Sequence, residues 1–187
     1  LPTGLPSPDA SSLDLSVVVV THRARAMVRD CLETLVNGGG LDGLDAEVIL
    51  VDNASGDGTA EMARAEFPTV RLIANPENVG FSRGNNQGIE ASTARHVLLL
   101  NPDTLIPRAA LKGCVDFLDA QEALVAAMSC RIESPDGSLQ WTCSRRLITP
   151  WSECCRALLL DRAFAKIDLF NREPDVRWDR SDMREVE

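Results

Sequence analysis

The stretch EVILVDNASGDGT, residues 47–59, changes character at its middle. Its first half, 47–52, is a short, continuous apolar run rich in β-branched residues, which is typical of a strand buried in a parallel sheet. Its second half is a polar turn containing Gly56 and Gly58, and a helical pattern follows it. The stretch therefore predicts a β-strand, a turn and a helix in immediate succession.

Similar apolar runs on either side of this stretch predict three more buried strands, at 15–20, 70–74 and 96–100. Helical patterns separate the strands. Their apolar faces are Met27, Val28, Cys31, Leu32, Leu35 and Val36; then Ala60, Ala63 and Phe67; then Leu111, Cys114, Val115 and Leu118, with Pro107 in the first turn. This alternation predicts an α/β fold, Rossmann-like, with a mostly parallel central sheet flanked by helices.

The two ends of the chain show other patterns. Residues 1–14 are rich in Pro, Ser and Gly and are expected to be a flexible leader or linker, which leaves 15–187 as the folded domain. Residues 125–146 predict two strands around a Pro-Asp-Gly turn. A helix opened by Thr149 and Pro150 follows. Its expected inner face is Trp151, Cys154, Cys155, Leu158 and Leu159.

Composition excludes several classes of protein. The net charge of −9 argues against nucleic-acid binding, and an anionic ligand would require a metal ion or a few focused arginines. No apolar run approaches the roughly 18 residues that span a bilayer. The six cysteines lack a C-x-x-C pair and only two histidines accompany them, which argues against a zinc site. Cys31, Cys114 and Cys154 fall at apolar positions of expected helices, so we expect them to be reduced and buried in a cytoplasmic protein.

Polar side chains follow each predicted strand, and the carboxyl ends of parallel strands share one edge of a sheet. Neither a G-x-G-x-x-G turn nor a P-loop is present there. Asp52, the last residue of its strand, is suited to accept a hydrogen bond from a ligand N–H. Asp57 and Thr59 are either helix-capping residues or ligand contacts, and both interpretations stay open.

The later strand ends add further candidates. In NPENVGFSRGNNQGI, residues 75–89, Arg83 is the best candidate for a diphosphate, whereas Asn86 and Gln87 are equally typical of a surface helix. In NPDT, residues 101–104, Asp103 is either a turn residue or an oxygen ligand suited to Mg²⁺ or Mn²⁺.

Several motifs in order resemble one family. VDNASGDGT, NPENVGFSRGNNQGI and LLLNPDT are similar to the family 2 glycosyltransferases of the rhamnosyltransferase type, which have the GT-A fold. SPDGSLQ (134–140), CSRR (143–146) and TPWSE (149–153) extend the resemblance, which runs from about Leu15 to the C-terminus. It implies a nucleotide-sugar-binding domain.

The resemblance also implies an activity. A sugar nucleotide, such as a dTDP-rhamnose-like or UDP-sugar donor, would give up its sugar with inversion and with help from Mg²⁺ or Mn²⁺. The acceptor would be a glycan or a lipid-linked molecule in envelope polysaccharide synthesis. Peripheral association with the cytoplasmic face of a membrane is compatible with such an acceptor.

Site residues follow from the matched motifs. Thr21 and Asp52 would contact the base and ribose, with Asn53 beside them; Arg83 and Asn85 would lie near the phosphates and ribose. Asn101 would lie beside the ribose, and Asp103 would ligate the metal. Because THRAR replaces the family's Asn-aromatic pair, His22 is either a neighbour of the base or a loop histidine.

The general base is the main departure from the family. Relatives carry it on a later acidic segment, so the resemblance places it beyond Glu187. Asp136, Glu133 and Glu153 are more typical of turn, surface or capping residues. A catalytically inactive sugar-nucleotide-binding or interaction module is therefore the alternative. A nucleotidyltransferase would need the Gly-rich, Lys-bearing loop that the sequence lacks.

Overall fold

The computed structural model describes most of the N-terminal two thirds of the chain and parts of the remainder. The described residues are 13–121, 125, 127–130, 132–138, 140 and 150–163. The chain divides into two compact units, 1–125 and 126–187, and each is described by itself. In the described part, no helix combines the length and apolar character needed to cross a membrane.

The first unit contains a four-stranded sheet, as the sequence predicts. Its strands are β1 (Leu15–Thr21), β2 (Ala46–Asp52), β3 (Arg71–Ala74) and β4 (His96–Leu100). All neighbours are parallel, in the order β3-β2-β1-β4. Thr21 pairs with Asp52, so β1 and β2 end side by side. The alternation of apolar runs and helical patterns is therefore confirmed as a parallel α/β sheet.

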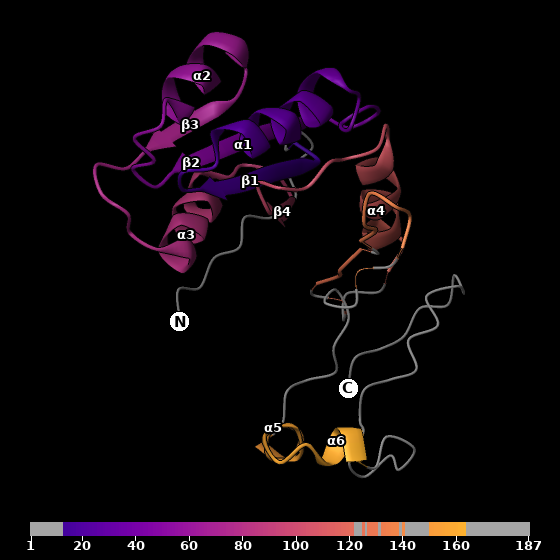
Figure 1. The fold of residues 1–187 in the computed structure, drawn as a ribbon. Helices are drawn as coiled ribbons and strands as arrows, with labels where there is room; N and C mark the ends of the chain where they lie inside the picture. The colour runs from indigo at the N-terminus through magenta and orange to yellow at the C-terminus, as the bar shows by residue number, and fades with distance from the viewer. Residues whose placement is uncertain are drawn as a thin grey trace. The chain divides into compact units, whose positions relative to one another are not determined.

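Helices cover both faces of this sheet (Figure 1). The helices are α1 (Arg25–Leu32), α2 (Thr59–Glu66), α3 (Phe81–Ala91) and α4 (Ala110–Asp119). Val17 and Val19 of β1 belong to the larger core cluster, which also takes residues of α1, α2 and α4. Val18 and Val20 point to the opposite face, where α3 lies against β1 and β2.

α3 approaches the sheet closely because two glycines face it. A Cβ built on Gly88 would lie 2.2 Å from Cγ1 of Val18, and one on Gly84 would lie 2.8 Å from Cγ1 of Val20. Neither distance is compatible with a real side chain. The glycines therefore allow the helix backbone to rest on the valines of β1.

The prediction that the outer strands are buried on both faces is wrong. Leu98 and Leu100 of β4 pack against the larger core cluster, but Val97 is 39% exposed and Leu99 50% exposed. β4 is an edge strand of the described sheet, and α3 covers β1 and β2 instead. β3, at the other edge, likewise exposes residues at both its ends.

The helix predictions need smaller corrections. Met27 was expected in the core but is 57% exposed, because α1 turns Val28, Cys31 and Leu32 inward and leaves the preceding residue outside. A π-helix, η1 (Glu33–Asn37), continues α1 where the sequence predicts regular helix. α4 begins at Ala110, so Pro107 precedes the helix and is not part of its first turn.

The expected turn in the second unit is confirmed at its tip. The Gly137 N–H donates to the Ser134 carbonyl at 2.8 Å, and the Ser138 N–H donates to Oδ1 of Asp136 at 2.9 Å. Asp136 is therefore a turn residue, as predicted. Residues 141–149, with Thr149 and most of the second expected strand, lie outside the described residues.

The expected inner face of the following helix is wrong. The helices are α5 (Pro150–Ala157) and α6 (Leu160–Ala163). Only Cys155 of the expected face is buried, whereas Trp151, Leu158 and Leu159 are 46%, 69% and 56% exposed. α5 ends before Leu158, and Leu159 has a φ of 56°, so both leucines fall in a turn and not on the helix face.

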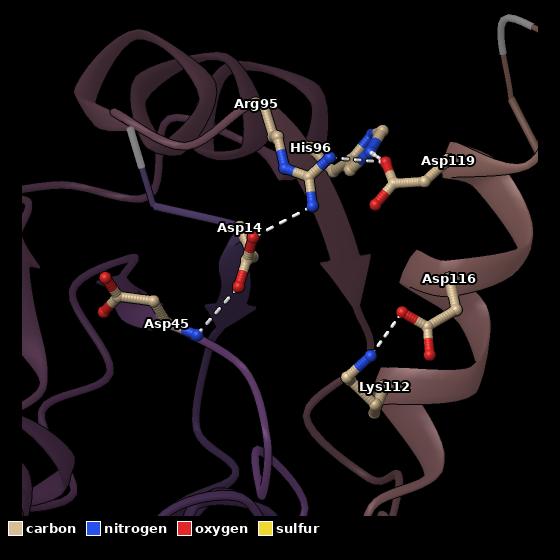
Figure 2. A network of polar contacts seen from close by, with 7 residues as sticks. All are labelled: Asp14, Asp45, Arg95, His96, Lys112, Asp116 and Asp119. Carbon is tan, nitrogen blue, oxygen red and sulfur yellow. Dashed lines mark hydrogen bonds and ion pairs between the residues drawn. The ribbon is translucent and has the colours of Figure 1, made fainter. Parts of the chain in front are cut away.

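The amino ends of the strands are joined by a cluster of charges, shown in Figure 2. We call Asp14, Arg95, His96 and Asp119 the amino-edge network. Arg95 donates to Asp119 at 2.6 Å and to Asp14 at 2.9 Å, and Nε2 of His96 donates to Asp119 at 2.8 Å. The network joins the starts of β1 and β4 to the end of α4. It also places Asp14, a residue of the expected leader, within the folded unit.

Candidate functional site

The site predicted from the sequence lies at the opposite, carboxyl edge of the sheet. Thr21 ends β1 and Asp52 ends β2, and the two residues are register partners. Asn101 and Asp103 follow the end of β4 at Leu100. The structure thus gathers residues that are up to about 80 positions apart in the sequence at one edge.

Thr21 has an incomplete set of hydrogen bonds. Its side chain is buried, with the residue only 2% exposed, and Oγ1 has no hydrogen-bond partner among the described residues. Buried hydroxyls nearly always have a partner, because leaving one without costs free energy. A ligand at the end of β1 would supply that partner.

Asp52 has one carboxylate oxygen engaged and one available. Oδ1 accepts hydrogen bonds from the Ser55 N–H, at 3.2 Å, and from the Ser55 hydroxyl. Oδ2 has no hydrogen-bond partner among the described residues, although Asp52 is only 5% exposed. Ser55 therefore orients the carboxylate and leaves its second oxygen for another donor.

His22 joins the loops that follow β1 and β2. Its Nδ1 lies 2.8 Å from the Asn53 carbonyl oxygen, and since a carbonyl can only accept, Nδ1 carries the proton. The residue is otherwise exposed. This bond orients the ring at the rim and leaves Nε2 without a hydrogen bond to any described residue.

Two of the three asparagines expected near the donor, Asn53 and Asn85, are already bonded to the protein. Nδ2 of Asn53 donates to the Gly80 carbonyl at 3.2 Å, and its Oδ1 accepts from Nδ2 of Asn75 at 2.8 Å. Nδ2 of Asn85 donates to the Phe81 carbonyl, one turn earlier in α3, at 3.0 Å. Both residues are buried. Their donor contacts remain predictions.

Arg83 lies in the first turn of α3 and is exposed. It forms no ion pair with any other described residue, in contrast to Arg95 at the amino edge. An arginine without a carboxylate partner at a rim is available for an anionic ligand. The side chain of Asn101 is also exposed, and its carbonyl accepts from the Thr104 N–H at 3.2 Å.

The loop that carries Asp103 is attached to the π-helix, a contact that sequence reasoning missed. Oγ1 of Thr34 accepts from the Ile106 N–H at 3.1 Å and donates to the Cys31 carbonyl at 2.9 Å. The Ala109 N–H donates to the Gly39 carbonyl at 2.9 Å. No local signal marks Thr34, because its partner is 72 residues away in the sequence.

The Asp103 carboxylate affects the pKa of Cys31, which lies beside this loop. Burial, and then the nearby Asp103 carboxylate, raise the pKa of the Cys31 thiol to about 12. Cys31 therefore stays protonated and serves as a small apolar side chain, as predicted from its position. Its Sγ lies 4.0 Å from the Asn101 carbonyl oxygen.

The residues present are compatible with a divalent metal shared with a ligand. Asp103 is exposed, and no other described residue forms an ion pair with it. No three His, Cys, Asp or Glu side chains are grouped for a metal within the described ranges. Mg²⁺ in proteins is commonly held by one or two carboxylates, waters and substrate phosphates, so a single carboxylate fits such a site.

For Asp57 and Thr59, the contacts favour a structural role at the start of α2, although the N-cap residue is Gly58 and makes no side-chain cap. Oδ1 of Asp57 accepts from the N–H and the hydroxyl of Thr59, at 3.1 and 2.5 Å. These bonds, and a hydrogen bond from the Arg25 N–H, lower the pKa of Asp57. Gly56 and Gly58 have φ values of 65° and 84°, so the turn requires them for its backbone.

Comparison with known proteins identifies the family. The model of the family described as "Glycosyl transferase family 2" matches residues 16–173. The chain belongs to glycosyl transferase family 2. The matched range includes the sheet, except for Leu15, and all the rim residues described above.

Two curated proteins are similar to this family 2 chain. The succinoglycan biosynthesis protein ExoO of Rhizobium meliloti (strain 1021) is 30% identical over 125 residues, which is 66% of this chain and 35% of ExoO. The uncharacterized glycosyltransferase YibD of Escherichia coli (strain K12) is 30% identical over 96 residues, 50% of this chain and 27% of YibD. The chain spans about a third of the length of these relatives.

A solved structure confirms the expected fold. The mannosyltransferase PcManGT from Pyrobaculum calidifontis, in complex with GDP-Man and Mn²⁺, superposes with a TM-score of 0.57 at 26% identity. The match covers 70% of this chain and 39% of PcManGT. The parallel four-stranded sheet flanked by helices is thus the arrangement of the GT-A glycosyltransferases.

Proposed function

We propose that this chain is the donor-binding part of a metal-dependent, inverting glycosyltransferase. It would take a hexose or deoxyhexose, such as rhamnose, from a nucleoside diphosphate and deliver it to a glycan or lipid-linked acceptor in envelope polysaccharide synthesis. One observation carries the proposal: the buried Thr21 hydroxyl lacks a partner beside a carboxylate, Asp52, that has one available oxygen. A polar ligand would complete both groups.

The nucleoside would lie at the ends of β1 and β2. Oδ2 of Asp52 would accept a hydrogen bond from a base N–H or a ribose hydroxyl, while Thr21 Oγ1 would donate or accept beside it. Ser55 would keep the carboxylate in that orientation. His22 would border the base from the loop after β1.

The diphosphate would lie between α3 and the loop after β4. Arg83 would meet a phosphate oxygen, and Asp103 would hold the metal, with Asn101 beside the ribose. The metal, when bound, would stabilise the negative charge of the departing nucleoside diphosphate. PcManGT, which is similar to this chain, is described with Mn²⁺ and GDP-Man, and this supports testing Mn²⁺ first.

Nucleotide titration tests the proposal. The chain would be titrated calorimetrically with dTDP, UDP and GDP, each with Mn²⁺, with Mg²⁺ and with a chelator. We expect one nucleotide to bind only when a metal is present, and Asp103→Ala to abolish that metal-dependent binding. Asp30→Ala is the matched control, because Asp30 is an exposed carboxylate on α1 away from the strand ends. Metal-independent binding, or none, would refute the proposal.

A catalytically inactive binding module remains the second candidate. It is favoured by the turn role of Asp136, whose Oδ1 accepts hydrogen bonds from the N–H and the hydroxyl of Ser138, so the contacts of Asp136 do not support it as a base. Transfer from a labelled sugar nucleotide to a membrane extract, assayed with the whole protein that contains this chain, would separate the two candidates. Nucleotide binding without transfer by that protein would favour the module. A cytoplasmic location stays part of either proposal.

A further inference from the structure

Three neutral amide side chains form a cluster at the rim, and we call Asn53, Asn75 and Gln87 the amide cluster. Asn75 and Gln87 exchange two hydrogen bonds: Nε2 of Gln87 donates to Oδ1 of Asn75 at 3.0 Å, and Nδ2 of Asn75 donates to Oε1 of Gln87 at 2.8 Å. With its second hydrogen, Nδ2 of Asn75 also donates to Oδ1 of Asn53, at a nitrogen–oxygen distance of 2.8 Å. Every atom of the Asn75 amide is thus engaged.

The cluster joins three separate elements of the first unit. Asn53 follows β2, Asn75 follows β3, and Gln87 lies on α3. The backbone reinforces it, since the Asn53 N–H donates to the Thr21 carbonyl and the Asn75 N–H to the Asp52 carbonyl, both at 2.9 Å. Backbone hydrogen bonds therefore connect the amide cluster to Thr21 and Asp52, the residues that end β1 and β2.

The cluster also closes the segment that leads into α3. The Gly80 carbonyl accepts from Nδ2 of Asn53 at 3.2 Å and from the Gly84 N–H at 3.1 Å. The segment 76–79 therefore begins after Asn75, a member of the cluster, and ends before Gly80, whose carbonyl accepts a hydrogen bond from the cluster. Both ends of the segment are attached to the strand ends.

Two sets of contacts hold α3 against the strands. Gly84 and Gly88 rest on the valines of β1 and set how closely the helix approaches the sheet. The hydrogen-bonded Asn75–Gln87 pair attaches the helix to the end of β3 at another position on its surface. Arg83 is four residues before Gln87 and shares its face of the helix, so a restraint on Gln87 also orients Arg83.

We propose that Asn75 and Gln87 are positioning residues that orient the first turn of α3 so that Arg83 meets the diphosphate of the donor. The pair itself carries no charge and touches no phosphate. The proposal rests on the proposed function for the identity of the ligand. It adds that the phosphate affinity of Arg83 depends on a side chain one turn away.

The first test separates phosphate binding from nucleoside binding. Gln87→Met keeps the size of the side chain and removes both hydrogen bonds. The probes are the nucleoside diphosphate that the wild-type chain binds and the same nucleoside without phosphates. We expect Gln87→Met to weaken diphosphate binding on the order of tenfold, which corresponds to the loss of about one charge-assisted hydrogen bond between Arg83 and a phosphate. Binding of the nucleoside without phosphates should not change.

Two comparisons sharpen this test. Asn86→Met makes a similar change at the exposed neighbouring position and should have no effect. The double variant Arg83→Ala with Gln87→Met should bind no more weakly than Arg83→Ala alone, because the pair acts through Arg83. Additive losses, or equal losses for nucleoside and diphosphate, would overturn the proposal.

Hydrogen exchange without any nucleotide provides an independent test. In Gln87→Met, the amides of residues 81–85 should exchange faster, while those of β1 and β2 keep the wild-type rate. Unchanged exchange at 81–85 would overturn the positioning role. If the wild-type chain binds no nucleotide, the proposed function fails, and the exchange result alone decides whether the pair orients α3.

Discussion

The two edges of the same sheet differ in how many of their polar side chains are paired within the protein. At the amino edge, the amino-edge network satisfies its charges internally, and Arg95 alone bridges two carboxylates (Figure 2). At the carboxyl edge, Thr21 Oγ1 and one oxygen of Asp52 lack partners among the described residues. Arg83 and Asp103 form no ion pairs there with described residues.

From this difference we infer that the amino edge contributes mainly to stability and that the carboxyl edge is suited to bind a ligand. The amino edge gains modest stability from paired charges, and it leaves little for a ligand to complete. At the carboxyl edge, Asp57 and one oxygen of Asp52 are also bonded, but the amide cluster and the Thr34 bond to the Ile106 N–H join neutral groups. Arg83 and Asp103 take part in none of these contacts. The following predictions test the contrast, from the largest expected effect on stability to the smallest.

Gly88→Ala tests whether the carboxyl edge depends on the close approach of α3. The new Cβ would lie 2.2 Å from Cγ1 of Val18, so helix and strand must separate. We expect a loss of roughly 1–3 kcal/mol in the free energy of unfolding, measured by urea denaturation. Gly113→Ala on α4 meets nothing within 4 Å and should instead gain about 0.5–1 kcal/mol. Equal effects would contradict this packing.

Thr34→Val tests the attachment of the Asp103 loop. It removes the acceptor of the Ile106 N–H and should cost on the order of 1 kcal/mol in unfolding free energy. Metal-dependent nucleotide binding should weaken as well, because the loop is held less firmly. Thr34→Ser keeps the hydroxyl and should retain both properties. Unaltered metal dependence in Thr34→Val would show that the loop is positioned by other contacts.

Thr21→Val should have opposite effects on stability and binding. The change replaces a buried hydroxyl that lacks a partner with a methyl group of similar size, so the free chain should gain up to about 1 kcal/mol. Nucleotide affinity should fall, since the ligand loses its partner at the end of β1. Urea denaturation and calorimetric titration measure the two effects. A destabilised variant would mean that the hydroxyl is already satisfied in the free protein.

Asp119→Asn tests the amino edge. The hydrogen bond from His96, and then the bond from Arg95, lower the pKa of Asp119, although partial burial opposes them. Its stabilisation is therefore complete above the unfolded pKa near 3.9 and is lost as pH falls through the folded value. We expect Asp119→Asn to lose roughly 0.2–1 kcal/mol at pH 7, with the difference from wild type shrinking below about pH 4. Nucleotide binding should not change.

The sequence predicted the strands and helices of the first unit because buried positions recur with a regular spacing of apolar residues. Continuous apolar runs identified all four strands, and the rule that ligands bind at strand carboxyl ends brought Thr21 and Asp52 together. The same pattern failed for Val97 and Leu99, since an apolar run does not say whether its strand is central or at an edge. It also failed for Met27, which lies one position off the buried stripe of α1.

The site divides in the same way. The positions of Asp52 and Asp103 at or just after strand ends, and of Arg83 in the first turn of α3, were predictable from the sequence, and their roles toward a ligand stay predictions. The roles of Thr34 and Asn75 were not predictable, because their partners lie far away in the sequence or on another element. The hydrogen bonds that Nδ2 of Asn53 and of Asn85 donate to backbone carbonyls were not predictable either, because a sequence does not show which partner an amide finds; the expected donor contacts of both residues stay predictions.

The sequence by itself determined the parallel α/β arrangement, the edge at which the polar residues gather and the family resemblance, because these depend on local periodicity and on motif order. The tertiary structure decided which polar groups are satisfied and which remain available. Hydrogen bonding depends on distances of about 3 Å between elements, and only the folded chain sets those distances. That is why the contrast between the two edges appears in the fold and not in the sequence.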